Sequence, residues 1–259
     1  MLDSLVCTVD LYDLIVLKKR KDDLINIEMR GRGLESLPPE KNNAYKAATA
    51  YISAFKTGGA DVTIYKNIPV GAGLGGSSAD AAGVLAGMAK LYGKGSEKQL
   101  EELAAGLGSD TPFMVSGGFA RMRGRGEILE KLPVKRRLNF LLLMPPHPVG
   151  AGECYARYDK NPLPPHSSDR ALAALEKGDV REFGGELFND LYGAAKSINP
   201  EIERAMEELK AFDPAGVSMT GSGSAVFALF ENEEFCAYAK SRYRGNFQKI
   251  TVKSGIFRG

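Results

Sequence analysis

The sequence predicts a mixed α/β protein with two domains. Segments with the alternating apolar pattern of strands are interspersed with segments whose apolar residues recur at helical spacing. A chain of 259 residues, 44% of them hydrophobic, is long enough for one large core or two small ones. The pattern of elements is weakest near residues 132–137. We therefore place the boundary between a first domain, residues 1–136, and a second domain, residues 137–259.

The first half should contain strands around three helices. Ser96 and Gln99 form a capping box that opens the third of these helices. The predicted strands are residues 5–11, 14–17, 24–29, 61–65 and 117–123. The predicted helices run from Asn42 or Asn43 to the stop at residues 58–59, over residues 81–92, and from residue 97 to about residue 105.

The second half should begin with a buried strand over residues 139–144, because this run is continuously apolar. Helices are predicted near Tyr155 and over residues 169–177, 180–195, 200–212 and 232–243. Residues 217–230 are typical of two strands joined by a tight glycine turn, and residues 247–252 of a last strand.

Composition excludes several classes of function. The 34 Lys and Arg nearly balance the 32 Asp and Glu, so the strong basic face of a nucleic-acid binder is not expected. The three cysteines (Cys7, Cys154, Cys236) and two histidines (His147, His166) do not form a metal-ligand pattern. No apolar run is long enough to span a bilayer, and no signal peptide is recognised. We therefore expect a cytoplasmic protein with reduced thiols and no membrane partner.

The strongest functional signal is a glycine-rich loop that leads directly into a predicted helix. Glycines at positions 71, 73, 75 and 76 allow positive φ angles and close approach of a ligand, and Ser77 and Ser78 begin the helix. Free amides at a helix start bind phosphate well. The predicted phosphate-binding residues are Pro69, Val70, Gly71, Ala72, Gly73, Leu74, Gly75, Gly76, Ser77 and Ser78. The loop lacks the Lys of a Walker A motif and the acidic partner of a dinucleotide fingerprint.

Asp110 is the second signal, within the segment Gly-Ser-Asp-Thr-Pro-Phe. Taken alone, an Asp two residues before Pro112 is most often a helix cap. Beside a phosphate loop, its carboxylate has a second possible role, which is to accept a proton from a hydroxyl nucleophile.

Two further segments have both a structural and a functional interpretation. Residues 220–225, Thr-Gly-Ser-Gly-Ser-Ala, are predicted to form a hairpin turn, and the alternatives are binding of a polyphosphate and packing against the first loop. Arg121, Arg123 and Arg125 alternate on one strand face, for which a solvated face is the default interpretation and pairing with phosphate the alternative.

The order and spacing of these four segments resemble the GHMP kinases. The resemblance rests on the Pro-x-Gly-x-Gly-Leu-Gly loop before Ser-Ser, on Gly-x-Asp-x-Pro-Phe, on Gly-Gly-x-Ala-x-x-x-Gly-x-Gly-Glu and on Gly-Ser-Gly-Ser-x-Val-Phe. It extends over nearly the whole chain, and Asn189-Asp190-Leu191 matches a further family element. The sequence context of Asp110 is similar to that of the branch acting on 4-diphosphocytidyl-2-C-methyl-D-erythritol.

The resemblance implies a GHMP-kinase fold, with an N-terminal ribosomal-S5-like ATP-binding domain and a C-terminal ferredoxin-like α/β domain. It implies that ATP, with Mg²⁺, binds the glycine-rich loop and that Asn42 lies near the adenine. Asp110 would be the catalytic base for the 2-hydroxyl of the small-molecule substrate. Tyr155, Gly221 and Ser222 would bind that substrate. For Tyr155 a place in the core of an amphipathic helix is equally compatible with the sequence. A monomer or weak homodimer is expected.

The sequence departs from the family pattern at the N-terminus. The family begins with Pro-Ala-Lys-Ile-Asn-Leu and an Asp-Gly-Tyr-His turn, and this sequence starts just after the position of that His. We expect the chain to begin at an internal Met of a longer reading frame, and to bind ATP while catalysing poorly. Two alternatives stay open: a kinase of the mevalonate, phosphomevalonate or homoserine type, and a non-catalytic nucleotide-binding protein.

Overall fold

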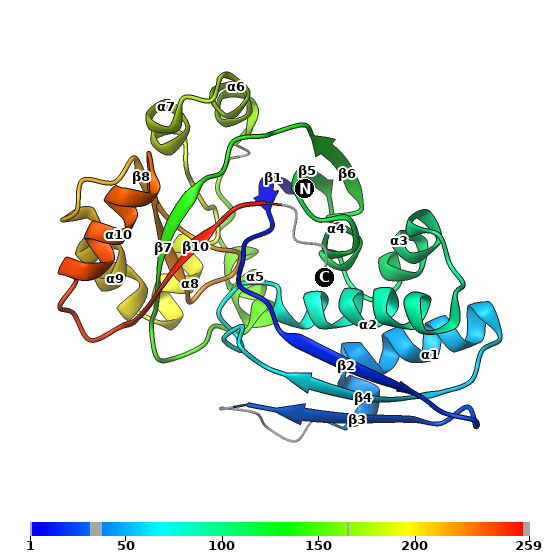
Figure 1. The fold of residues 1–259 in the computed structure, drawn as a ribbon. Helices are drawn as coiled ribbons and strands as arrows, with labels where there is room; N and C mark the ends of the chain where they lie inside the picture. Colours follow the sequence, from blue (N-terminus) through cyan, green and yellow to red (C-terminus); the bar gives the residue numbers. More distant parts are fainter. Residues whose placement is uncertain (1, 32–37, 165, 256–259) are drawn as a thin grey trace. The chain divides into compact units, whose positions relative to one another are not determined.

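A computed structural model describes residues 2–31, 38–164 and 166–255 and divides into two compact units (Figure 1). Unit 1 contains Leu11–Val70 and Gly75–Glu130. Unit 2 contains Asp3–Asp10, Gly71–Leu74 and the chain from Lys131 onward. The predicted boundary between residues 136 and 137 stays a prediction. The structure adds that two short early segments pack with the later part of the chain.

Unit 1 contains a three-stranded sheet in the order β2-β4-β3. Strand β4 (Ala60–Tyr65) lies in the centre, antiparallel to β2 (Leu14–Lys19) and parallel to β3 (Ile25–Arg30). Their alternating pattern places every second side chain on the same face, so Ile15, Val62 and Ile64 share one face. That face is the apolar one, and it is the face that the helices cover.

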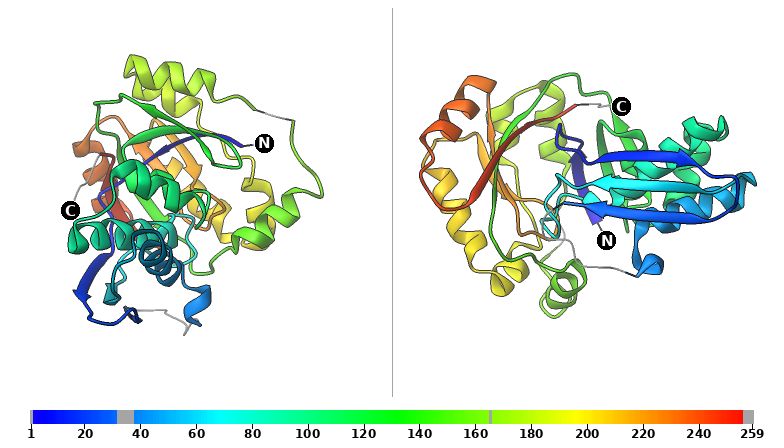
Figure 2. Two further views of the ribbon diagram at one scale, coloured as in Figure 1. Left: turned by 90° about the vertical axis from the view of Figure 1, so that its right-hand side faces the viewer. Right: turned by 60° about the horizontal axis from the view of Figure 1, so that its bottom comes forward.

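Two helices cover that face of the sheet: α1 (Asn43–Phe55) and α2 (Gly76–Tyr92). The right-hand view of Figure 2 looks onto the opposite face of the sheet, with the helices behind it. Tyr51 from α1 and Leu85 and Met88 from α2 are fully buried in the shared core. The packing fixes the N-terminus of α2 beside the sheet, and with it Gly75 and Gly76 of the glycine-rich loop.

The other elements of unit 1 follow α2 or precede α1. The capping box predicted at Ser96 and Gln99 is present at the start of its helix. These elements are η1 (Pro39–Lys41), α3 (Glu97–Ala105), α4 (Thr111–Ser116), β5 (Phe119–Gly124) and β6 (Ile128–Leu132), whose last residues belong to unit 2.

Unit 2 contains a four-stranded antiparallel sheet in the order β10-β7-β9-β8. Two helices, α9 (Glu201–Lys210) and α10 (Glu233–Arg242), pack on it and share its core. Leu141 and Ala228 from the central strands lie in that core with Leu209 from α9. The strands are β7 (Asn139–Met144), β8 (Gly216–Met219), β9 (Val226–Phe230) and β10 (Gln248–Lys253).

The remaining elements of unit 2 are one strand and four short helices. Helix α5 carries Tyr155, and α7 packs against β8. These elements are α5 (Ala151–Tyr158), α6 (Asp169–Lys177), α7 (Val180–Gly185), α8 (Tyr192–Ile198) and β1 (Leu2–Cys7), of which Asp3 onward belongs to unit 2.

Two expectations from the sequence were wrong in extent, and one strand was not predicted. The strand expected over residues 5–11 is Leu2–Cys7, because beyond it only an isolated bridge pairs Val9 with Ser254. The helix expected over residues 180–195 is two helices, α7 and α8, because the segment between them turns at Asn189. Strand β6 was not predicted. It is rich in charge and mostly exposed, so it lacks a clear apolar alternation.

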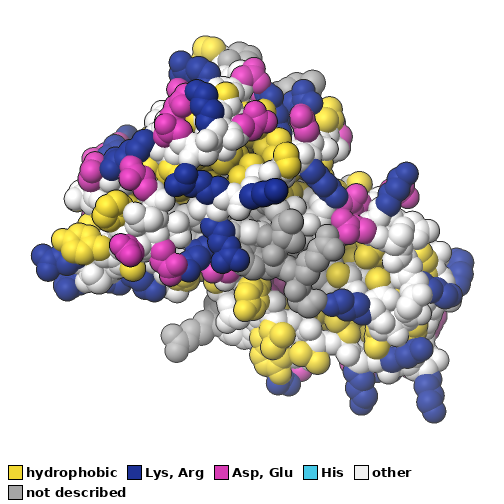
Figure 3. Space-filling view, turned by 45° about the horizontal axis from the view of Figure 1, so that its top comes forward, with side chains coloured by type: hydrophobic (Ala, Val, Ile, Leu, Met, Phe, Trp, Pro, Cys, Tyr) yellow, Lys and Arg dark blue, Asp and Glu magenta, His cyan; other side chains and the backbone are white. Residues whose placement is uncertain are grey.

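On the face drawn in Figure 3, both Lys and Arg side chains and Asp and Glu side chains reach the surface. Within the described ranges, none of the helices has the length and apolarity needed to cross a bilayer.

Two adjacent glycines of α7 provide a matched test of this packing. A Cβ on Gly184 would overlap the carbonyl oxygen of Ala215, whereas a Cβ on Gly185 would meet nothing within 4 Å. We expect Gly184→Ala to lower the free energy of unfolding by about 1–3 kcal/mol through overpacking. Gly185→Ala should raise it by about 0.5–1 kcal/mol, because Ala is the better helix former. Urea denaturation measures both, and equal effects of the two variants would contradict the observed packing.

Candidate functional site

The second half of the glycine-rich loop forms the start of α2 in unit 1. Gly75 has the predicted positive φ (67°) at the cap position and offers no side-chain cap to the helix. Gly76 is the first helical residue and its φ is not positive, so the expectation of positive φ there was wrong. Its small size is needed instead, since a Cβ would lie 3.0 Å from Ile68 Cγ2. An uncapped start of a 17-residue helix is an anion-binding end.

The first half of the loop, Gly71–Leu74, belongs to unit 2. Gly71 and Gly73 have the predicted positive φ angles, 69° and 72°. The amide of Ala225 donates to the carbonyl of Ala72 (3.1 Å), and Thr220 Oγ1 donates to the carbonyl of Gly73 (3.0 Å). The loop is therefore held by the second glycine-rich segment through one backbone hydrogen bond and one hydrogen bond from a side-chain hydroxyl.

The second segment is a hairpin turn between β8 and β9, as one of its interpretations predicted. Thr220 N donates to Ala225 O (3.1 Å), and Gly223 N donates to Thr220 O (2.9 Å). Its packing against the first loop confirms a second interpretation. Gly221 has a positive φ (54°), and its assignment with Ser222 to substrate binding stays a prediction.

Asn42 and Asn43 lie at the N-terminus of α1, and the side chain of each makes a hydrogen bond. Asn42 is the N-cap, as predicted, and its side chain accepts from the amide of Ala44 (2.9 Å). Asn43 Nδ2 donates to Ser77 Oγ in the first turn of α2 (3.0 Å). The starts of α1 and α2 are thus joined by side chains, and the capping oxygen of Asn42 is already used.

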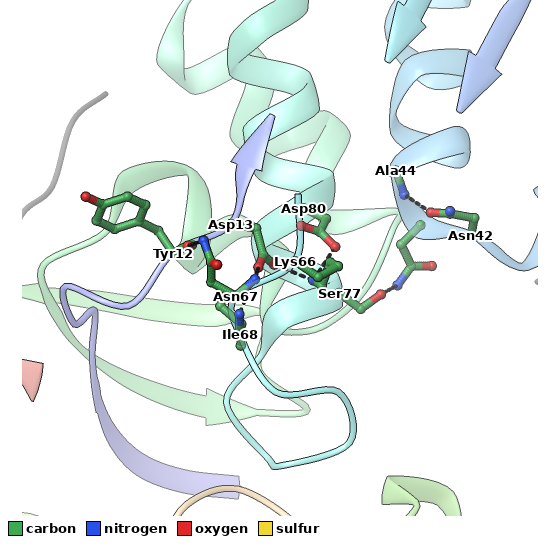
Figure 4. Close-up of polar contacts among 10 residues, drawn as sticks. Tyr12, Asp13, Asn42, Ala44, Lys66, Asn67, Ile68, Ser77 and Asp80 are labelled. Atoms are coloured by element: carbon green, nitrogen blue, oxygen red, sulfur yellow. Dashed lines mark hydrogen bonds and ion pairs between the residues drawn. The ribbon is translucent and has the colours of Figure 1, made fainter. Parts of the chain in front are cut away.

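A buried charged cluster of Asp13, Lys66 and Asp80 lies beside the start of α2 (Figure 4). Lys66 Nζ donates to Asp13 Oδ2 and, at 2.6 Å, to Asp80 Oδ2. The side chains of Asp13, Lys66 and Asp80 are only 2%, 6% and 6% exposed. Asp13 Oδ1 also accepts from the amides of Asn67 and Ile68, just before the loop. The cluster therefore fixes the backbone that leads into the loop.

The sequence analysis missed this cluster. Its one visible signal is a charged residue, Asp80, on a helix whose neighbouring residues Ala81 and Ala82 are small and buried. A buried carboxylate requires a partner, so a buried Asp80 predicts a nearby cation.

Within the cluster, burial shifts the protonation equilibrium of one carboxyl toward the protonated form. Burial raises the pKa of Asp80 from 3.8 to about 7, against the opposing attraction of Lys66. The geometry agrees with this direction, because a single lysine serves two buried carboxylates. Asp80 Oδ1 has no hydrogen-bond partner among the described residues, whereas Asp13 accepts two backbone amides as well. A proton on Asp80 would leave the cluster neutral.

Asp110 occupies the residue before α4 in unit 1, but its side chain makes no capping hydrogen bond. The cap interpretation, which the sequence alone favoured, was therefore wrong. Pro112 stands in the first turn, as predicted, so the proline and not the Asp side chain shapes the helix start. Desolvation by neighbouring atoms raises the pKa of the Asp110 carboxyl, although the residue remains exposed. An exposed carboxylate with a raised pKa is suited to accept a proton.

The exposure of Tyr155 and of Arg123 bears on the interpretations given to these two residues. Tyr155 in α5 is 45% exposed, so its interpretation as a core residue was wrong. Arg123 is exposed and pairs with Glu130 at 3.3 Å, which confirms the solvated-face interpretation for this residue. Across the part of the chain that the structure describes, no group of three or more His, Cys, Asp or Glu could hold a metal ion.

The sequence matches two family descriptions: GHMP kinases N terminal domain over residues 42–118, and GHMP kinases C terminal over residues 171–239. A 4-diphosphocytidyl-2-C-methyl-D-erythritol kinase from Carboxydothermus hydrogenoformans is 39% identical over 234 residues, which is 88% of this chain and 80% of the relative. The kinase of the same name from Caldicellulosiruptor saccharolyticus is 35% identical over 253 residues, 96% of this chain and 86% of the relative.

Solved structures agree with these sequence relatives. A crystal structure of 4-(cytidine 5'-diphospho)-2C-methyl-D-erythritol kinase has a TM-score of 0.78 and 29% identity, covering 98% of this chain and 90% of the other. A homoserine kinase from Cytophaga hutchinsonii has a TM-score of 0.73 at 20% identity, covering 97% and 89%. The second likeness is one of fold alone.

The buried cluster generates a stability prediction. Lys66→Met leaves two buried carboxylates without their cation, and should lower the free energy of unfolding by about 3–5 kcal/mol. Adding Asp80→Asn should recover at least about 1 kcal/mol, because it removes a buried carboxyl that without Lys66 must either stay ionised with no cation or take up a proton above its ordinary pKa. Urea denaturation of the single and double variants measures this, with the exposed-site variant Lys98→Met as the control. A double variant less stable than Lys66→Met would contradict the assignment.

The raised pKa of Asp80 generates a pH prediction. Because the folded pKa, about 7, lies above the ordinary 3.8, the stability that Asp80 contributes is present at low pH. It is lost as pH rises toward 7. The free energy of unfolding of the wild type minus that of Asp80→Asn should fall by on the order of 1 kcal/mol per pH unit between pH 4 and 7. Denaturant titrations at pH 5, 6 and 7.5 measure this difference, and a constant value would contradict the raised pKa.

Proposed function

Because the chain belongs to the 4-diphosphocytidyl-2-C-methyl-D-erythritol kinases of the GHMP kinase superfamily, we propose that it transfers the γ-phosphate of ATP to the 2-hydroxyl of 4-diphosphocytidyl-2-C-methyl-D-erythritol. The products are the 2-phosphate and ADP. The reaction belongs to the non-mevalonate route to isoprenoid precursors, and we place it in the cytoplasm.

The uncapped start of α2, with the positive-φ glycines before it, is the observation that carries the phosphate site. Its amides and dipole favour the negative charge of a triphosphate. We assign Pro69 to Ser78 to the ATP phosphates and Asn42 to the neighbourhood of the adenine. Because the Asn42 side-chain oxygen already caps α1, its amide nitrogen is the group that remains to reach a ligand.

Asp110 is the proposed catalytic base. Its carboxylate accepts the proton of the 2-hydroxyl as that oxygen attacks the γ-phosphorus. The bond from the γ-phosphorus to the bridging oxygen of ATP breaks, and ADP leaves with the electron pair. The raised pKa and the absence of a capping hydrogen bond at Asp110 both support this role.

The remaining assignments concern the acceptor and the metal. Tyr155 offers an exposed aromatic ring on which a cytosine could stack, and we assign Gly221 and Ser222 to the same substrate. Mg²⁺ accompanies ATP and offsets the phosphate charge, as in other phosphoryl transfers. We propose that the protein acts as a monomer or weak homodimer, without nucleic-acid or membrane partners.

The direct test is ADP release with Mg-ATP and each of three acceptors. We expect release with 4-diphosphocytidyl-2-C-methyl-D-erythritol and none above background with mevalonate or homoserine. Release with mevalonate or homoserine instead would favour another small-molecule kinase. If ATP binds but no ADP is released with any of the three acceptors, the result would favour a non-catalytic nucleotide-binding protein.

Asp110→Asn should lower kcat by about 10²–10⁴-fold while leaving the Kd for ATP unchanged, because the amide cannot accept the proton. Since the pKa of Asp110 is raised, the acid limb of kcat/KM for the wild type should lie above pH 3.8. Steady-state kinetics and ATP titration measure these quantities, with the exposed turn variant Asp23→Asn as the control. Unchanged turnover in Asp110→Asn would remove this residue as the base.

A further inference from the structure

The side chain of Asn189 makes three hydrogen bonds, and two of them connect it to the start of the hairpin turn of residues 220–225. Its side-chain nitrogen donates to Met219 O (2.8 Å) and to Gly221 O (2.9 Å). Its side-chain oxygen accepts from the amide of Leu191 (2.9 Å). The side chain thus spans from the segment before α8 to the carbonyl groups on both sides of Thr220.

Those two carbonyl groups flank the residue that holds the glycine-rich loop. Thr220 Oγ1 donates to Gly73 O, and Ala225 N donates to Ala72 O. The two backbones also approach closely, because a Cβ on Gly73 would overlap Thr220 O and a Cβ on Gly221 would lie 2.9 Å from Gly73 O. A displacement of the turn would therefore displace Ala72 and Gly73.

We propose that Asn189 is a positioning residue for ATP. Its side chain holds the hairpin turn of residues 220–225, and this turn holds the Gly71–Leu74 part of the phosphate loop. This inference rests on the proposed function, since it assigns that loop to the phosphates of ATP. All the residues in this chain of contacts belong to unit 2.

The chemistry of the position requires an amide side chain. Two carbonyl acceptors need two N–H donors from one group, and the Leu191 amide needs an acceptor from the same group. Aspartate has the same size but no donor when ionised, and would place negative charge against two carbonyl oxygens. Asn189→Asp is therefore a nearly isosteric change that keeps the acceptor for Leu191, removes both donors to the turn and adds a negative charge.

The test compares ATP affinity and kcat in wild type and variants. We expect Asn189→Asp to weaken ATP binding at least tenfold, measured as the Kd for a non-hydrolysable ATP analogue and as the KM for ATP. Thr220→Val removes the next hydrogen bond of the same path and should weaken binding in the same direction. Because both act through one turn, the double variant should lose less affinity than the product of the two single losses.

A control separates positioning from loss of stability. Leu209→Ala opens a cavity in the core under α9 and lowers the melting temperature, while it removes none of the hydrogen bonds made by the Asn189 and Thr220 side chains. We expect it to leave the Kd for the analogue within twofold of the wild type. Asn189→Gln keeps the donors and acceptor on a longer side chain, and should recover part of the affinity.

The outcomes separate this inference from the proposed function. If Asn189→Asp and Thr220→Val lower the melting temperature as Leu209→Ala does, yet bind the analogue within twofold of the wild type, the positioning role is wrong and the kinase assignment is untouched. If the wild type does not bind the analogue, the ATP assignment of the loop fails, and the inference fails with it.

Discussion

The close contact between the backbone at Gly73 and the backbone of the Thr220 turn is the constraint on which the proposed phosphate site depends. Side chains at Gly73 or Gly221 would enter the space that the opposite backbone occupies. The two loops are therefore packed through main-chain atoms, with hydrogen bonds from Thr220 and Ala225. A loop held in this way keeps a defined shape without a bound ligand, which lowers the entropic cost of gathering a triphosphate.

The backbone that leads into the same loop is fixed by different physics. In unit 1, buried charges hold the chain: Lys66 neutralises Asp13, and Asp13 accepts the amides of Asn67 and Ile68 just ahead of the loop. Such a cluster adds little stability relative to apolar packing, but leaving it incomplete is costly. The arrangement thus favours one backbone path into α2, whose free amides are the feature that a phosphate needs.

Local patterns in the sequence predicted the parts of the structure that local physics determines. The caps at Asn42 and Ser96, the buried strand over residues 139–144 and the positive φ angles of Gly71, Gly73 and Gly75 depend on neighbouring residues. The charged cluster joins residues 53 and 14 positions apart, so no local pattern contains it. The local pattern also gave a wrong prediction for Asp110. This residue occupies the cap position of α4, but its side chain makes no capping hydrogen bond.

The central claim is that ATP phosphates bind the free amides at the start of α2. Amide-resolved NMR titration with a non-hydrolysable ATP analogue and Mg²⁺ tests it most directly. The account predicts that the largest shifts fall on the amides of Gly75–Ser78, accompanied by shifts of Gly73 and Gly221 through their shared contact. Saturable binding with unshifted amides at residues 75–78, and with shifts concentrated on other elements, would contradict it.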